Sequence, residues 1–362
     1  LTSLHIGSGN MLQKDSDFVF GKDAEDFSVV GVIDPRKVLT LVGEENIDAW
    51  TVGIENGRST EDIVKQYAPN ATITDYSLHT IDSYLSRTPQ QIKEFIRDGL
   101  DRPYIPGSSI KGAMRTAVLA SIAATMDEAE LSRVTKNNGN ITAKVFEAKV
   151  FGKDPNHDVF RYLLVGDAFA TGYRTAVYNM VNINERTERG FWDTSKQMAT
   201  EVLLSGTEVD FSLVLKQPEL RPADMPAMPK ALSSVNALLN VINNHTRTLL
   251  ANEIEIWESK NVDSQSEEKV NSYIEQLKDL LNTANECKGT LSAVMRIGHG
   301  SGWRFITGAW TERLSDNEFG AVVNKARPGN AKRYADYDFP KSRRLEEDEC
   351  EPLGFVKLTL CD

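Results

Sequence analysis

The stretch Arg102-Pro-Tyr-Ile-Pro-Gly-Ser-Ser-Ile-Lys-Gly-Ala-Met-Arg115 breaks regular structure and then begins a helix. Two prolines and Gly107 interrupt the chain, and the hydroxyl of Ser108 or Ser109 can cap the helix that follows. Helical spacing then gives this helix one apolar stripe, made by Ile110, Met114, Ala117, Val118 and Ile122. We therefore expect a helix that starts within this stretch and buries one face.

The start of this helix also carries positive charge. Lys111 and Arg115 are four residues apart and share a face near the N-terminus. Cations are unfavourable at that end, because the helix dipole is already positive there. Helix-start amides, serine hydroxyls and two cations together indicate a site for an anion such as phosphate.

Shorter patterns surround this helix. Residues 27–33 read as a strand, and residues 59–67 and 89–96 as brief helices, the second capped by Thr88. Residues 160–215 read as β-structure, in which 178–190 is an extended run ending in a charged tip with Arg186 and Arg189. A proline-rich linker at 217–229 precedes a helical block, in which Ser264 and Glu267 could form a capping box.

Composition limits the class of protein. The chain has 362 residues, 40 % of them hydrophobic, which suggests two domains with ordinary cores. No apolar run is long enough to cross a bilayer, and the first residues show no signal peptide. Three cysteines and five scattered histidines predict no metal site and fit a reducing cytoplasm.

The charge is uneven along the chain. A net charge of −11 would by itself argue against nucleic acid as a partner. Residues 291–344, however, contain ten Lys and Arg against five Asp and Glu. The sequence therefore confines its basic groups to particular loops, and the acidic remainder would suit docking onto more basic proteins.

Two segments contain the same Gly-Ser-Gly run and are called the glycine loops: His5-Ile-Gly-Ser-Gly9 and Gly298-His-Gly-Ser-Gly302. Their spacing does not match the dinucleotide fingerprint or the P-loop, so a nucleotide enzyme is not favoured. Each loop carries a histidine, and Trp303 and Arg304 follow the second, which suits phosphate and base contacts. An alternative is that His5 or His299 acts as a general base and cleaves RNA.

Several motifs together resemble the RAMP superfamily of CRISPR effector proteins. They are Leu4–Gly9, Tyr104–Thr116, Ile183–Thr187 with Leu203–Phe211, and the loop Arg296–Trp303. The ending, Phe339-Pro-Lys-Ser-Arg-Arg-Leu345 with Pro352–Lys357, is similar to the Csm series of type III-A systems. Where common members carry Asp-Arg in the thumb-like hairpin, this chain has Asn184-Glu185-Arg186.

The resemblance implies an α+β fold of two ferredoxin-like (RRM-type) modules, residues 1–216 with the thumb-like hairpin and residues 217–362 with a helical insertion at 232–285. It implies a cytoplasmic, non-catalytic subunit without cofactor, which caps one end of an antiviral ribonucleoprotein and holds the 3′ part of the CRISPR RNA. The implied partners are the backbone subunit (Csm subunit three), the small subunit (Csm subunit two), target RNA, and cellular nucleases that trim the RNA.

The residues expected to contact RNA lie in the motifs and in the basic ending. Because the RRM aromatic signature is absent, we expect phosphate and shape rather than base stacking to govern binding. These residues are His5, Gly7, Ser8, Gly9, Ser108, Ser109, Lys111, Arg115, Arg186, Arg189, Arg296, Gly298, His299, Gly300, Gly302, Trp303, Arg304, Lys341, Arg343 and Arg344.

Overall fold

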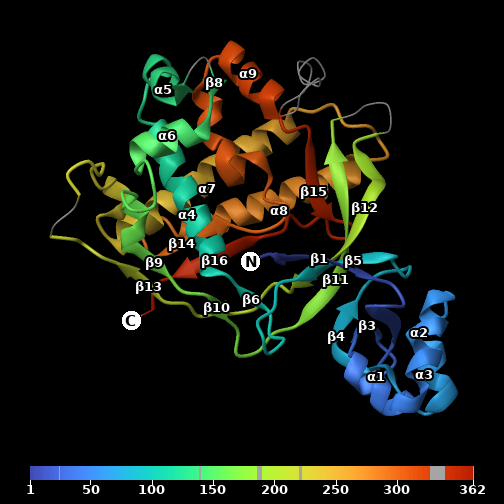
Figure 1. The fold of residues 1–362 in the computed structure, drawn as a ribbon. Coiled ribbons are helices and arrows are strands. Elements are labelled where there is room, and N and C mark those ends of the chain that lie inside the picture. The colour runs from blue at the N-terminus through green and yellow to red at the C-terminus, as the bar shows by residue number, and fades with distance from the viewer. Residues whose placement is uncertain (24, 138–139, 186–189, 220–221, 327–338, 362) are drawn as a thin grey trace.

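A mixed β-sheet organises the chain, which was analysed as a computed structural model (Figure 1). The structure describes residues 1–23, 25–137, 140–185, 190–219, 222–326 and 339–361. In sheet order the strands are β1 (Gly7–Gln13), β5 (Gln91–Phe95), β12 (Trp192–Leu203), β11 (Thr175–Asn184), β4 (Ser77–Ser83), β3 (Ser28–Ile33) and β2 (Phe18–Lys22). The α+β class is thereby confirmed.

The long hairpin β11–β12 lies at the centre of this sheet. The strand pairs β5–β12 and β4–β11 are parallel, and the other pairs are antiparallel. Two strands share one edge of β11: β4 lies beside Ala176 and Val177, and β15 (Ser342–Glu346) lies beside residues 180–184. The C-terminal part of the chain thus completes a sheet that the N-terminal part begins.

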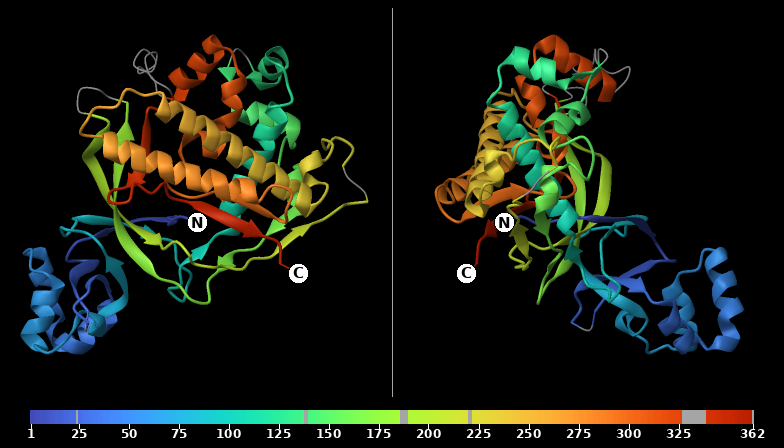
Figure 2. Two further views of the ribbon diagram at one scale, coloured as in Figure 1. Left: turned by 180° about the vertical axis from the view of Figure 1, so that it is seen from behind. Right: turned by 60° about the vertical axis from the view of Figure 1, so that its left-hand side comes forward.

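Helices cover the sheet in two separate groups, which Figure 2 shows from behind and from the side. The smaller group packs with β2–β4 around its own core and consists of α1 (Pro35–Val42), α2 (Ile47–Glu55) and α3 (Thr60–Tyr67). The larger group consists of α4 (Gly107–Ala123), α5 (Glu128–Thr135), α6 (Ala143–Val150), α7 (Val235–Glu258), α8 (Glu267–Glu286) and α9 (Asp316–Ala326). Among the described helices, none is both long and apolar enough to span a membrane.

Short strand pairs connect the larger helices to the sheet. They are β6 (Tyr104–Ile105) with β10 (Ala168–Phe169), β7 (Lys136–Asn137) with β8 (Asn140–Ile141), β9 (Leu163–Val165) with β13 (Leu213–Leu215), and β14 (Ser292–Arg296) with β16 (Phe355–Thr359). The helical block expected at 232–285 corresponds to α7 and α8, whose apolar faces are buried.

The helix expected after Ser108 is confirmed as α4. Its stripe is buried at Ile110, Met114, Ala117 and Val118. The serine cap is wrong, because Pro106 precedes the helix without a side-chain cap, and the Gly107 amide donates to Asp167 Oδ1 at 2.7 Å. The protein's own carboxylate therefore occupies this helix terminus.

Two other local predictions fail because tertiary contacts outweigh them. Residues 89–96 contain strand β5 rather than a helix, since Gln91–Phe95 pairs with β1 on one side and β12 on the other. The capping box of α8 is absent, since the helix begins after Ser266, whose hydroxyl accepts a hydrogen bond from the Trp192 amide at 3.0 Å. In the first case, neighbouring strands pair with the backbone of residues 91–95, and in the second, the hydroxyl before the helix is used by the amide of a strand.

The two ends of the chain are hydrogen-bonded to each other. The Thr2 amide donates to the Phe355 carbonyl at 3.1 Å, and the Gly354 amide donates to the Ser3 carbonyl at 2.9 Å. One hydrophobic core contains Leu4, residues of α4 and α7, and Met295 of β14. The two parts on either side of residue 216 therefore share both a sheet and a core, and the domain boundary stays a prediction.

A buried carboxylate on α7 joins several of these elements. Glu253 accepts hydrogen bonds from Trp257 Nε1 at 2.8 Å, from the Tyr273 hydroxyl at 3.0 Å and from Arg343 Nη2 at 2.9 Å, and Arg304 Nη1 lies 3.6 Å away. We call these five residues the Glu253 cluster. Burial alone would raise the pKa of Glu253, but the charges of both arginines and the hydrogen bonds lower it to about 2. The cluster fixes β15, α8 and the segment after β14 against α7.

We expect Glu253→Gln to lower the free energy of unfolding by about 3–5 kcal/mol, because the buried guanidinium of Arg343 loses its counter-ion and that of Arg304 keeps only Glu312. Urea unfolding at pH 7 measures this loss. The matched control is Glu258→Gln on the same helix, which removes an exposed pair with Lys278 (3.1 Å) and should cost at most about 1 kcal/mol. Equal losses in the two variants would contradict the central role of the cluster.

Candidate nucleic-acid interface

The two glycine loops, far apart in sequence, meet at the start of β1. The His299 amide donates to the His5 carbonyl at 2.8 Å. Gly298 has φ +79°, and a methyl group at its Cα would overlap the His5 carbonyl, so only glycine fits this crossing. The structure thus brings Gly7, Ser8 and Gly9 into one surface region with Gly298 and Gly300.

The buried side chain of Arg296 holds the backbone of the second glycine loop. Its Nε donates to the Leu353 carbonyl at 3.0 Å and its Nη1 to the Ser301 carbonyl at 3.3 Å. The guanidinium carbon lies 4.7 Å from the ring centre of Phe355, and the residue is 7 % exposed. Burial lowers its pKa to about 10. Arg296 thus holds the loop backbone from the protein interior, and its RNA contact stays a prediction.

Three further predicted contacts have internal partners. Arg343 and Arg304 belong to the Glu253 cluster, and Arg304 Nε also lies 2.6 Å from Glu312 Oε1. Trp303 packs edge-on against Phe339, with ring centres 5.3 Å apart, and its Nε1 donates to Thr311 Oγ1 at 3.3 Å. The RNA contacts of these three side chains stay predictions, and in this structure the same groups contact carboxylates and core residues.

The anion site expected on α4 is largely filled by the protein itself. Arg115 Nε donates to Glu147 Oε2 at 2.9 Å, and its Nη1 donates to Asp158 Oδ2 at 2.8 Å. Its guanidinium carbon also lies 4.2 Å from the ring centre of Phe151. Arg115 is thus a structural cation, and Ser108, Ser109 and Lys111 are the predicted groups that remain beside the helix start.

A group of one lysine, one arginine and two histidines, without carboxylate partners among the described residues, lies where the glycine loops meet. The His5 and His299 rings are 5.6 Å apart, and the positive charges of Lys93 and Arg344 act on His299. His299 Nε2 and Arg344 Nη1 are buried and have no hydrogen-bond partner among the described residues. Among the residues that the structure describes, no carboxylate forms an ion pair with Lys93, His299 or Arg344. We call His5, Lys93, His299 and Arg344 the cationic cluster.

Burial and mutual repulsion govern the protonation of this cluster. Desolvation first, and then the charge of Lys93, lowers the pKa of His5 to about 4, although a hydrogen bond of 2.6 Å between its Nδ1 and the Glu201 carbonyl opposes the shift. Desolvation, followed by the charges of Lys93, His5 and Arg344, lowers the pKa of His299 to about 4. The pKa of Lys93 is also lowered, by desolvation and then by Arg344. A bound anion would relieve this repulsion.

Sequence reasoning missed Lys93, because residues 89–96 were read as a helix. As part of β5, Lys93 lies opposite Met11 of β1 and Thr200 of β12, which places it next to the first glycine loop. The available signal was the position of Lys93 between the buried Ile92 and Phe95, a pattern too short to distinguish a strand from a helix.

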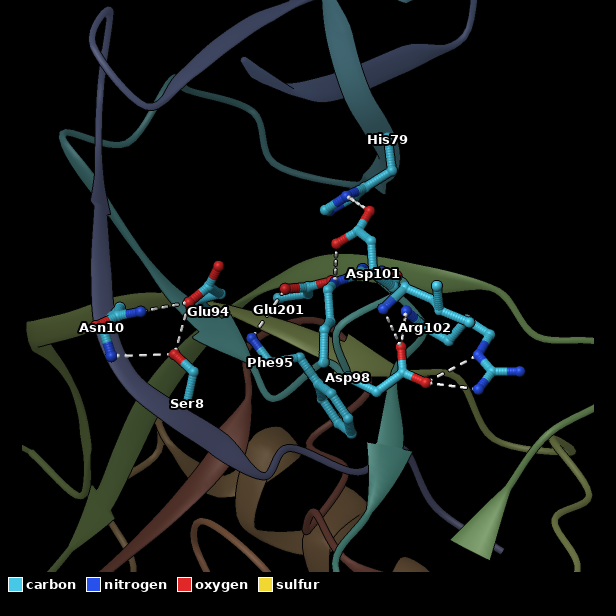
Figure 3. Close-up of polar contacts among 11 residues, drawn as sticks. Ser8, Asn10, His79, Glu94, Phe95, Asp98, Asp101, Arg102 and Glu201 are labelled. Carbon is cyan, nitrogen blue, oxygen red and sulfur yellow. Dashed lines mark hydrogen bonds and ion pairs between the residues drawn. The ribbon is translucent and has the colours of Figure 1, made fainter. Parts of the chain in front are cut away.

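Figure 3 shows the polar groups that border the first glycine loop. Ser8 Oγ donates to Glu94 Oε2 at 2.7 Å, and Asn10 Nδ2 donates to the same oxygen at 2.9 Å. The Phe95 amide donates to Glu201 Oε2 at 2.8 Å, and His79 Nδ1 lies 2.6 Å from Asp101 Oδ2. The loop is therefore held rigidly, and its exposed backbone at Gly7 and Gly9 faces solvent.

The remaining predicted residues fall in three places. Arg186 and Arg189 lie outside the described residues. The Lys341 carbonyl accepts from the Glu185 amide at 3.0 Å, next to β15. Gly300 and Gly302 have φ values of +83° and +76° in the second loop.

One comparison with known proteins gives a family, and another gives a fold. The sequence profile of the RAMP superfamily matches residues 1–305. A chain in the cryo-EM structure of a Csm-crRNA-target RNA ternary complex from a type III-A CRISPR-Cas system is similar, with a TM-score of 0.71 and 21 % identity over 99 % of this chain and 98 % of that chain. The crystal structure of T.onnurineus Csm5 is similar over the same shares, with a TM-score of 0.61 and 20 % identity. No curated protein sequence matches.

The low pKa values of His5 and His299 predict that stability falls in mild acid. The unfolded chain binds protons at both residues as the pH falls from about 6.5 to about 4, whereas the folded chain does not, so stability is lost over that range. Each histidine contributes up to about 1.4 kcal/mol per pH unit. Urea unfolding at pH 7, 6 and 5 should show a shallower pH dependence for His299→Gln than for the native chain. An unchanged dependence would contradict the burial of a neutral imidazole.

Proposed function

Because this chain belongs to the RAMP superfamily, we propose that it is an RNA-binding, end-cap subunit of a type III-A CRISPR effector complex, in the position of Csm subunit five. The similarity to Csm5 and to a chain of the Csm ternary complex extends over 99 % of its length, which supports this assignment. In this role the chain would hold the 3′ part of the CRISPR RNA and support its maturation for antiviral defence.

The cationic cluster is the observation that carries the proposal. Lys93, His299 and Arg344 lie beside an exposed glycine backbone and lack carboxylate partners among the described residues, which is the arrangement that a phosphate of RNA would complete. Lys111 lies at the start of α4, and four other basic residues already have internal partners: Arg115, Arg296, Arg304 and Arg343. Binding would therefore concentrate at the junction of the two glycine loops.

The partners follow from the same assignment. The chain would contact the backbone subunit, Csm subunit three, with Csm subunit two as a further neighbour, and would meet target RNA through the complex. Cellular nucleases would trim the 3′ end of the CRISPR RNA. The two ferredoxin-like modules expected from the family resemblance, and a cytoplasmic location, belong to this proposal.

A ribonuclease is the second candidate function, favoured by the close approach of His5 and His299. General acid–base cleavage needs one neutral and one protonated group near neutral pH. With the pKa of both residues lowered to about 4, neither supplies the acid. His5 is moreover 2 % exposed. We therefore propose a binding subunit without nuclease activity of its own.

Replacing Lys93 and Arg344 together by alanine should weaken RNA binding. Fluorescence anisotropy of the full chain with single-stranded RNA at several salt concentrations measures both affinity and salt dependence. Loss of two phosphate contacts should reduce the slope of log affinity against log salt by about 1.4. The charge-matched control is Lys153→Ala with Lys278→Ala, which removes two cations already paired with Asp224 and Glu258. Equal effects of the two pairs would overturn the assigned site.

Incubation of the purified chain with labelled repeat RNA, with and without divalent metal, tests the second function. We expect the RNA to stay intact, because neither His5 nor His299 is protonated near neutral pH. Specific cleavage that disappears in both His5→Ala and His299→Ala would establish the ribonuclease instead.

A further inference from the structure

Three planar side chains lie together at the short β6–β10 pair, which belongs to neither the glycine-loop site nor the Glu253 cluster. The Tyr104 and Phe169 rings lie 5.6 Å apart at an interplanar angle of 16°, and the Arg102 guanidinium carbon lies 5.4 Å from the centre of the Phe169 ring. Phe169 is 39 % exposed. An aromatic stack at the surface of a protein exposes apolar area that a core position would bury.

The strand geometry explains why these rings point outward. Ile105 and Ala168, the neighbouring residues of the same two strands, are buried in the main core. Successive side chains of a strand point to opposite faces, so Tyr104 and Phe169 point away from that core. Their exposure is thus built into the register of β6 and β10, which pairs Tyr104 with Phe169 directly.

The stack is held in place before any ligand arrives. Asp98 Oδ2 accepts from both Nε (2.9 Å) and Nη2 (2.6 Å) of Arg102, a fork that fixes the guanidinium plane (Figure 3). The Phe169 backbone exchanges hydrogen bonds with Asp210 at 3.2 and 3.3 Å. Because Asp98 also neutralises Arg102, the platform is rigid and nearly uncharged.

A short ladder of backbone hydrogen bonds leads from the first glycine loop to this stack. The Ile96 amide donates to the Ile6 carbonyl at 2.8 Å, and the Tyr104 amide donates to the Ile96 carbonyl at 3.5 Å. Neighbouring strands lie about 4.8 Å apart, so Tyr104 is about 10 Å from Ile6, the residue before Gly7. RNA that passes over the glycine loop therefore reaches the stack within a few nucleotides.

We propose that Tyr104, Phe169 and Arg102 form a stacking platform for an unpaired base of RNA held at the glycine loops. This inference rests on the proposed function. Two nearly parallel rings with a guanidinium group beside them match the flat face that every nucleobase offers, and such stacking tolerates any sequence. The expectation that binding uses phosphate and shape alone would then be incomplete, since a base would contribute as well.

The test compares two ligands: a short unstructured RNA and an abasic ribose-phosphate chain of the same length. In fluorescence anisotropy with the full chain, Tyr104→Ala with Phe169→Ala should weaken binding of the RNA by between about 5-fold and 150-fold. Binding of the abasic chain and the salt dependence should not change. Phe169→Trp should retain binding of the RNA.

The control variant is Leu164→Ala, which shortens another exposed apolar side chain on the nearby strand β9 and should leave both affinities unchanged. Thermal unfolding confirms that each variant is folded. Equal losses on both ligands, or no loss on the RNA, overturn the platform.

Other outcomes separate the platform from the proposed function. If Lys93→Ala with Arg344→Ala weakens RNA binding but the aromatic double variant does not, the platform fails and the function stands. If the native chain binds neither ligand, both fail. If the aromatic variant binds RNA normally but no longer assembles with its neighbouring subunits, the stack is a protein contact and the nucleobase assignment is overturned.

Discussion

The buried carboxylate of Glu253 is the interaction on which the arrangement of the C-terminal part depends. A single charge on α7 receives bonds from α7, α8 and β15 and lies beside the segment that follows β14. Since β15 pairs with β11, this ion cluster also sets how the central hairpin meets the helical layer. The second glycine loop lies between these fixed points, and Arg296 holds its backbone from below.

This internal use of arginine changes the meaning of the charge pattern. The basic residues concentrated at 291–344 suggested a phosphate-binding segment. Three of these arginines, Arg296, Arg304 and Arg343, instead make contacts inside the protein. What remains for a ligand is a small set of basic residues: Lys93 of β5, Arg344 of β15, and the two histidines of the glycine loops. A chain with net charge −11 can therefore bind RNA through few groups, provided that those groups lack internal counter-ions.

The sequence predicted those features that depend on local periodicity and failed on those that depend on partners. The apolar stripe of α4 and the helices α7 and α8 follow from spacing alone. The strand β5 does not, because its conformation is imposed by β1 and β12 on either side. Likewise, the number of arginines in a segment does not show which guanidinium groups are paired inside the protein. Arg343 was therefore selected as an RNA contact, and Lys93 was missed. The meeting of the two glycine loops needed the complete fold.

The hydrogen bonds between the first and last residues have a consequence for biosynthesis. Thr2 and Ser3 pair with Phe355 and Gly354, which are synthesised long after them. A nascent chain consequently cannot form these pairs until the second part of the protein has been made, and contacts of such large sequence separation form slowly. The contact between His5 and His299 likewise needs both parts of the chain. The candidate interface can therefore form only after the second glycine loop has been synthesised.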